Sequence, residues 1–379
     1  MRRRRADYID RLDRRLAEKG AGRDVYAIRP LELEKLQEHL PKGMLLLSPI
    51  ALDDQLVVFA VTHDTITHFD TKIPGSEIER LIAAVLEEVT PPGGTQRGAV
   101  PLQATTRKLD GAAIDRLRAP SAKLYDLILR APLSRFGAPK LLVISAAGSL
   151  RYLPFAALHD GQGWLMERTP FIEVTSLDQQ KFATLAKLST KPSVLALADP
   201  DGSLPGARRE VGEVKAALRS VRILDGEGAT LPALRAAIRA PGYDIVHLAT
   251  HGRLDGQRPE QSHILLAGQP LYYKDIPPLR FAHTRLVVLS ACDTASRGSG
   301  VEVTGLAYQF ERTNVRAVVA TLWPVDDGAT AKLMAAFYRQ LQKGDPPAQA
   351  LAAAQRAGAE QPQWRNPYYW APFILLGAP

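Results

Sequence analysis

From Thr190 onward, short apolar runs alternate with helical segments, and this rhythm leaves few folds open to the chain. Near-continuous apolar runs are typical of strands that are covered on both faces. Strands that alternate with helices predict a mostly parallel sheet with helices on both sides, so we expect an α/β fold. The runs that we interpret as strands are SVLALADP (193–200), YDIVHLATHG (243–252), RLVVLSACDT (285–294), VRAVVATLWPVDD (315–327) and APFILLGAP (371–379).

The first half of the chain has a less regular pattern. Residues 43–71 hold short strand-type runs that are separated by turn residues. Residues 76–89 have the periodicity of an amphipathic helix, with Ser76 as the expected N-cap. A later helical segment is expected to break near Pro120 and Pro132, because proline removes a backbone donor and clashes with the preceding turn.

Charge and composition disfavour nucleic acid as a partner. The net charge is +8, but Arg2 to Arg5 form the only dense basic cluster, and Asp7, Asp10 and Asp13 follow it closely. We interpret residues 1–37 as a basic helical lead with a solvated surface. Aromatic residues make up 7% of the chain, and none stands between basic residues as a base-stacking platform would.

The chain of 379 residues has a single cysteine, Cys292, which cannot form an internal disulfide. No apolar run is long enough to span a bilayer. No apolar stretch follows the N-terminal arginines as it would in a secretory signal. We therefore expect a reducing, cytoplasmic location.

Two of the expected strands lead directly into reactive residues. IVHLAT is followed by His251 and Gly252, and LVVLSA is followed by Cys292. The carboxyl ends of parallel strands are where ligands bind in such sheets. An imidazole beside a thiol lowers the pKa of the thiol and supplies a proton to a leaving amine, as a cysteine peptidase requires. The backbone N–H groups of Gly252 and Cys292 would then form the oxyanion hole.

Simpler interpretations exist for each residue alone. A lone cysteine is commonly a small buried hydrophobe, and a histidine near a strand end is often a hydrogen-bonded core residue. His247 and His251 resemble a zinc pair only on a helix; in a strand they lie about 13 Å apart, so we expect no metal site and a core or supporting role for His247. The chain also lacks a phosphate loop, a dinucleotide fingerprint and a GxSxG elbow, so no cofactor is expected.

The motifs resemble those of the CHAT domain family, caspase-like cysteine peptidases of clan CD that are related to separase. The resemblance covers residues 38–379. It implies a caspase-type sheet with His251 and Cys292 as the catalytic dyad, in an active subdomain of residues 186–379. It also implies a degenerate, protease-like subdomain at residues 38–185. The segments that carry it are DIVHLATHG, LVVLSACDT, LPGARREV, AVVATLWPVDDGAT, GSLRYLPFAAL, FYRQLQKG, ALAAAQ, WAPFILLG and LYDLILRAPL.

The resemblance also suggests where substrate binds. LWPVDD is similar to a separase loop whose last aspartate faces a P1 arginine, and Asp327 aligns with that aspartate. The alternative is that Asp326 or Asp327 caps the following helix. Ser290 and Asp293 flank the thiol and are further candidates for the groove, and the small Ser290 leaves space for an uncharged P1 side chain.

We therefore expect a cysteine endopeptidase that cleaves a protein substrate and responds to an activator protein. The family resemblance points to bacterial stress, defence or cell-death signalling. The alternative is a caspase-fold scaffold that binds a partner without cleaving it. The loop TASRGSGVEVTG (294–305) with Arg297 is a candidate for self-cleavage.

Overall fold

The structure is a computed structural model that describes nine stretches of the chain. Most of the expected N-terminal lead, and the loop that holds Cys292, Asp293 and Arg297, lie outside them. The described stretches are residues 33–89, 111–174, 188–189, 191–240, 242–253, 261–290, 301–313, 315–323 and 325–377.

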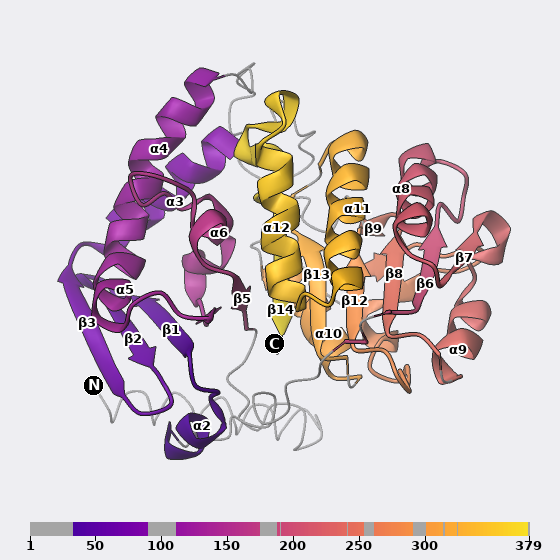
Figure 1. Cartoon of the computed structure of the whole chain (residues 1–379), viewed down its shortest axis with the longest axis horizontal. Coiled ribbons are helices and arrows are strands. Elements are labelled where there is room, and N and C mark those ends of the chain that lie inside the picture. Colours follow the sequence, from indigo (N-terminus) through magenta and orange to yellow (C-terminus); the bar gives the residue numbers. More distant parts are fainter. Residues whose placement is uncertain are drawn as a thin grey trace.

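One sheet of eleven strands runs through the described residues (Figure 1). Strands β1, β4, β5 and β14 are parallel to one another, and so are β13, β12, β8, β6 and β7; the two groups run in opposite directions where β14 meets β13. At one end of the sheet β1, β2 and β3 form an antiparallel meander. The expected α/β fold is confirmed. In spatial order the strands are β3 (Ile66–Lys72), β2 (Gln55–Val61), β1 (Met44–Ala51), β4 (Leu141–Ile144), β5 (Phe171–Glu173), β14 (Phe373–Gly377), β13 (Ala317–Thr321), β12 (Leu286–Leu289), β8 (Ile245–Ala249), β6 (Val194–Ala198) and β7 (Val221–Asp225).

The central strands are buried on both faces, which explains why the sequence shows them as continuous apolar runs. Along β8, Ile245 packs in a core with α11 and α12, and Val246 packs in a second core with α9 and α10. One face of the sheet is covered by α8 (Pro205–Ala217), α11 (Asp327–Lys343) and α12 (Pro347–Ala359), which lie side by side in Figure 1. The other face is covered by α9 (Leu231–Arg239) and α10 (Val301–Glu311).

The N-terminal half differs from two expectations. Helix α3 (Gly75–Val89) begins one residue before Ser76, so Ser76 lies inside its first turn and is not its cap. The helical segment does not break at Pro120, which lies inside α4 (Gly111–Tyr125). A π-helical turn (Asp126–Arg130) continues α4 into α5 (Ala131–Phe136). Pro132 occupies the first turn of α5, where its missing N–H is tolerated.

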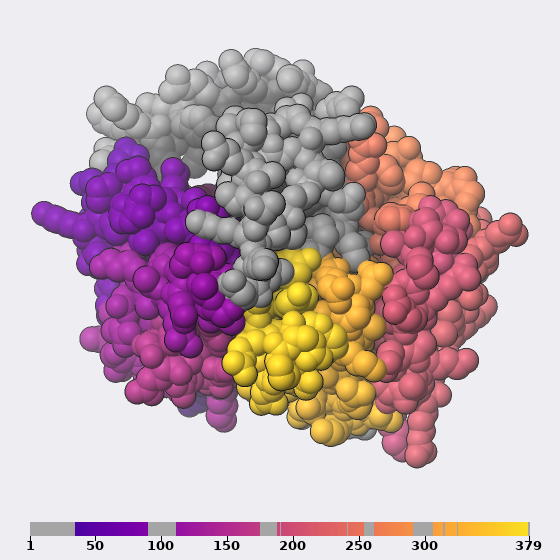
Figure 2. All heavy atoms as spheres, turned by 90° about the horizontal axis from the view of Figure 1, so that it is seen from above, coloured from indigo at the N-terminus to yellow at the C-terminus, as the bar shows by residue number. Residues whose placement is uncertain are grey.

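The two halves of the chain share a sheet and a core. Strand β14, at the C-terminus, pairs with β5 of the N-terminal half on one side and with β13 on the other. The C-terminal segment, in yellow, lies between the magenta and orange parts of Figure 2. Across this seam the Arg356 guanidinium donates to Met166 O at 3.1 Å, and the rings of Trp164 and Trp370 lie 5.7 Å apart. The division at residue 185 stays a prediction, but the largest core of the described residues contains side chains of both halves.

No helix in the part of the chain that the structure describes has both the length and the apolar character needed to cross a membrane.

Candidate active site

The carboxyl ends of β6, β8, β12 and β13 meet at one edge of the sheet, because these four strands are parallel neighbours. Strands β8 and β12 pair directly, with Leu248 opposite Leu289. His251 follows β8 after one intervening residue, and Ser290 follows β12 immediately. The expected adjacency of the histidine strand and the cysteine strand is therefore present in the fold.

The backbone around His251 is held by a small second sheet. Gly252 is buried in β9 (Gly252–Arg253) and pairs with Ile264 in β10 (His263–Ile264). The carbonyl of His251 accepts from Leu265 N at 2.8 Å, and Thr250 Oγ1 donates to Leu265 O at 2.9 Å. These two hydrogen bonds to Leu265 therefore fix the backbone from which the imidazole projects.

The imidazole of His251 contacts the loop that follows β6. Its Nε2 lies 2.8 Å from Ser203 Oγ. The Ser203 hydroxyl donates to Asp201 Oδ1 at 2.7 Å, and Ser203 N donates to the same oxygen at 3.2 Å. Hydrogen bonds from the Ser203 side chain and backbone hold the pKa of Asp201 below its ordinary value, and His251 adds to this effect. No motif in the sequence indicated a role for Ser203 or Asp201.

Asp199 anchors that loop to the sheet and to α8. It has a φ of 45°, an uncommon conformation for a residue with a side chain, and it is 1% exposed. Its N–H donates to Ala249 O at 3.1 Å. Its carboxylate accepts from Leu204 N at 2.7 Å and pairs with Arg208 Nε at 2.6 Å. The loop that presents Ser203 is thereby tied to the strand that presents His251.

A buried polar cluster lies beneath this edge of the sheet. Ser290 Oγ donates to Glu210 Oε2 at 2.8 Å. The other oxygen, Glu210 Oε1, lies 3.1 Å from His247 Nε2, although the two atoms lack the alignment of a hydrogen bond. His247 Nδ1 lies 2.9 Å from Tyr338 Oη. Burial, together with the Glu210 carboxylate, raises the pKa of Tyr338 well above its ordinary value.

This cluster changes the interpretation of Ser290 and agrees with that of His247. Ser290 is buried with its hydroxyl turned toward Glu210 on α8, so this group is engaged below the groove that we expected it to line. His247 is fully buried and belongs to the same cluster, in agreement with the expected core or supporting role. Glu210 belongs to the LPGARREV motif, which was the available sequence signal for its importance.

The start of α11 separates the two aspartates of the LWPVDD segment. Asp326 is the N-cap, and its carboxylate accepts from Ala329 N at 2.9 Å. Asp327 is exposed, and its carboxylate lies against Gly206, where a Cβ atom would collide with it. Gly206 is three residues beyond Ser203, so Asp327 lies near the loop that contacts His251. Asp327 lines a hollow of about 430 Å³ between α8 and α11, and Arg209 and Lys332 line it too.

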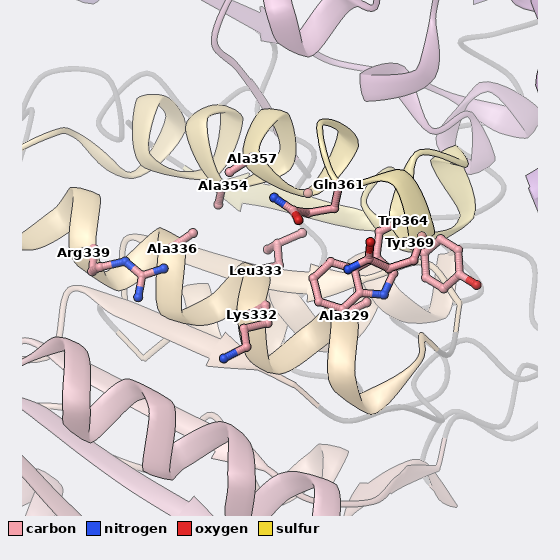
Figure 3. Close-up of a pocket in the computed structure, with 12 residues that line it drawn as sticks. Ala329, Lys332, Leu333, Ala336, Arg339, Ala354, Ala357, Gln361, Trp364 and Tyr369 are labelled. Atoms are coloured by element: carbon pink, nitrogen blue, oxygen red, sulfur yellow. The ribbon is translucent and has the colours of Figure 1, made fainter.

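A second hollow of about 310 Å³ lies between α11 and α12 (Figure 3). Leu333, Ala336 and Trp364 line it, with Lys332 and Arg339 at its rim. It is formed on the outer side of two helices that cover the sheet, and His251 is not among its lining residues.

A comparison with known sequences identifies the family. The CHAT domain profile matches residues 118–378, which is more than half of the chain. The chain belongs to the CHAT domain family. The resemblance that the motifs indicated is thus confirmed.

Two curated relatives of this CHAT domain are much longer proteins. It is 24% identical over 328 residues to tetratricopeptide repeat protein 28 of Mus musculus, covering 69% of this chain and 13% of the relative. It is 23% identical over 345 residues to the Homo sapiens protein of the same name, covering 73% and 14%. The chain therefore spans about one seventh of these relatives, or less.

The fold is similar to that of separase in the Saccharomyces cerevisiae separase–securin complex. The TM-score is 0.58 at 10% sequence identity, and the match covers 92% of this chain and 31% of that chain. This similarity shows a caspase-like fold for the CHAT domain.

Proposed function

We propose that this CHAT domain is a cysteine endopeptidase with His251 and Cys292 as its catalytic dyad. The observation that carries the proposal is the register of β8 and β12, in which Leu248 stands opposite Leu289. His251 comes three residues after Leu248, and Cys292 comes three residues after Leu289. Equal spacing from a paired position supports the meeting of imidazole and thiol at one sheet edge.

In the proposed reaction, His251 takes the thiol proton and the Cys292 thiolate attacks the substrate carbonyl. The protonated imidazole then gives its proton to the amine as the C–N bond breaks, and an acyl-enzyme remains. Water attacks this acyl group, with His251 taking one water proton. The C–S bond then breaks, the carboxylic acid product leaves, and the imidazolium returns its proton to the Cys292 thiolate. The N–H groups of Gly252 and Cys292 are the proposed donors to the oxyanion, and the anchored backbone at Gly252 supports a preorganised donor.

An active-site label tests the proposal directly. A peptide acyloxymethyl ketone should label the wild-type thiol, and both Cys292→Ala and His251→Ala should abolish labelling and peptide cleavage. His283→Ala is the matched control, because His283 is an exposed histidine on the loop before β12. Wild-type protein that binds a partner but neither reacts with the label nor cleaves peptides would favour the scaffold alternative instead.

We further propose that Asp327 gives the site a preference for a basic P1 residue. The support is that Asp326 takes the capping role, which leaves the exposed Asp327 carboxylate available beside Gly206. A carboxylate can bind the guanidinium of arginine through two parallel hydrogen bonds. Arg209 and Lys332 border the same hollow and would compete with a substrate cation, so the preference has to be measured.

A P1-randomised peptide library separates the possibilities. Asp327→Ala should lower the ratio of cleavage after arginine to cleavage after leucine by about tenfold, the size of one charged hydrogen bond. Asp225→Asn, at the exposed carboxylate that ends β7, should leave the ratio unchanged. A wild-type preference for small or apolar P1 residues would instead favour a groove shaped by Ser290 and Asp293.

We propose a protein substrate and an activator protein as the partners of this peptidase. The setting in bacterial stress, defence or cell-death signalling stays a prediction.

A further inference from the structure

We infer that Ser203 and Asp201 are positioning residues that set the tautomer and the ring orientation of His251. The inference rests on the proposed function only in assigning His251 the role of base. The geometry itself is independent of that role. Both residues come from the loop between β6 and α8, and neither belongs to the motifs that the sequence analysis singled out as catalytic.

The proton positions follow from the oxygen–oxygen contact. Asp201 is ionised at neutral pH, because hydrogen bonds from Ser203 lower its pKa. A carboxylate offers no proton, so the 2.7 Å contact between Ser203 Oγ and Asp201 Oδ1 requires the serine hydroxyl as its donor. The hydroxyl proton is then committed, and the 2.8 Å contact between Ser203 Oγ and His251 Nε2 requires the imidazole as its donor.

This direction selects one form of the neutral ring. With the proton on Nε2, the lone pair of His251 lies on Nδ1, and Nδ1 becomes the atom that can accept a proton. After that transfer the imidazolium still donates through Nε2 to Ser203. No proton passes to Asp201, whose part is to hold the Ser203 hydroxyl so that its oxygen faces the ring as an acceptor.

The orientation of the ring depends on how firmly the donor and acceptor are held. Asp199 ties the loop to Ala249 on β8 and to Arg208 on α8. The His251 backbone is held by Leu265 on the other side. A turn in which Asp201 merely caps Ser203 would account for the contacts within the loop, but it would not account for the contact with His251. That third contact joins residues 48 positions apart.

Ser203 and Asp201 are both exposed, so their effect on His251 is screened by water. We therefore expect a loss smaller than the roughly 10²–10⁴-fold contribution of general acid–base catalysis itself. Ser203→Ala should lower kcat about tenfold with little change in KM, and Ser203→Thr, which keeps a hydroxyl, should restore most of the rate. Ser220→Ala, at an exposed serine before β7, is the matched control.

A spectroscopic measurement does not need catalysis. In the full chain with ¹⁵N-labelled histidine, long-range ¹H–¹⁵N spectra report which ring nitrogen carries the proton, and His251→Gln assigns the signal. The wild type should show the Nε2–H form, and Ser203→Ala should shift His251 toward a mixture of both forms. Asp201→Ala should have a similar effect in the wild type and little further effect in the Ser203→Ala background, because Asp201 acts through Ser203.

The outcomes separate this inference from the proposed peptidase. A His251 tautomer that is the same in the wild type and in Ser203→Ala would overturn the inference, even in an active enzyme. A loss of kcat that Ser203→Thr fails to restore would count against it as well. If the tautomer shifts as expected in a chain without peptidase activity, the positioning role stands and the proposed function is wrong.

Discussion

Glu173 carries a carboxyl group that is buried in the described part of the chain. It ends β5 at the seam of the two halves, is 5% exposed, and its Oε1 has no hydrogen-bond partner. Desolvation raises the pKa of Glu173 to about 8, because burial disfavours the charged carboxylate. At neutral pH the folded chain therefore keeps this side chain protonated.

This residue should make the folded state less stable at alkaline pH. Below pH 4.5 the carboxyl is protonated in both the folded and the unfolded chain, and its full contribution is present. Between pH 4.5 and about 8 only the unfolded chain ionises, so stability falls as the pH rises, by on the order of 5 kcal/mol in total. Chemical denaturation across this range should show a flatter profile for Glu173→Gln. Glu227→Gln, at an exposed carboxyl, should reproduce the wild-type slope.

At the scale of elements, the Glu210 cluster joins four of them below the proposed site. Glu210 lies on α8, Tyr338 on α11 and His247 on β8, and Ser290 directly follows β12. Each of the four side chains is at most 7% exposed. Buried polar groups of this kind contribute mainly through the cost of leaving a partner unpaired. The cluster thereby ties the middle of β8 and the end of β12 to helices α8 and α11.

Removing the Glu210 side chain should lower the free energy of unfolding more than removing the side chain of Glu213, which lies on the same helix. Glu210→Ala leaves Ser290 and His247 without their carboxylate and should lower the free energy of unfolding by about 1–3 kcal/mol. Glu213 pairs with Lys332 at 2.7 Å at the surface, and Glu213→Ala should cost less than about 1 kcal/mol. Urea denaturation of the two variants measures the difference. Equal losses would mean that the buried cluster adds nothing beyond a surface ion pair.

At the scale of the whole molecule, the C-terminal segment decides whether the chain behaves as one unit. Trp370 is fully buried against Trp164 of the N-terminal half, and its carbonyl accepts from Gln355 Nε2 at 2.9 Å. Strand β14, which follows Trp370, completes the pairing between β5 and β13. These contacts predict that the two halves unfold together.

Trp370→Ala should lower the free energy of unfolding of both halves at once, by about 3–5 kcal/mol. Far-UV circular dichroism and tryptophan fluorescence should then report one shared transition at a lower denaturant concentration. Trp364→Ala, at a partly exposed tryptophan in the hollow of Figure 3, is the matched control and should have a smaller effect. Two separate transitions in the wild type would show that the halves fold independently.

The sequence by itself determined the central strands and the long helices in the second half of the chain, but the expected strands did not include β7 or the short strand β10. Buried parallel strands are continuous apolar runs, and their covering helices have a visible apolar stripe, so both signals are local. It also placed His251 at the carboxyl end of its strand, since this position depends only on where the apolar run stops. The N-terminal half was less predictable, because helix α4 continues through Pro120 and into a π-helical turn.

Only the tertiary structure decided the strand order and the polar contacts at the proposed site. The position of β14 between β5 and β13 joins residues that are about 200 positions apart, and local patterns carry no information about such pairing. The contacts of Ser203 with His251 and of Glu210 with Ser290 likewise join side chains from distant segments. Such contacts exist only once the sheet brings the ends of its parallel strands to one edge, which is why no spacing in the sequence revealed them.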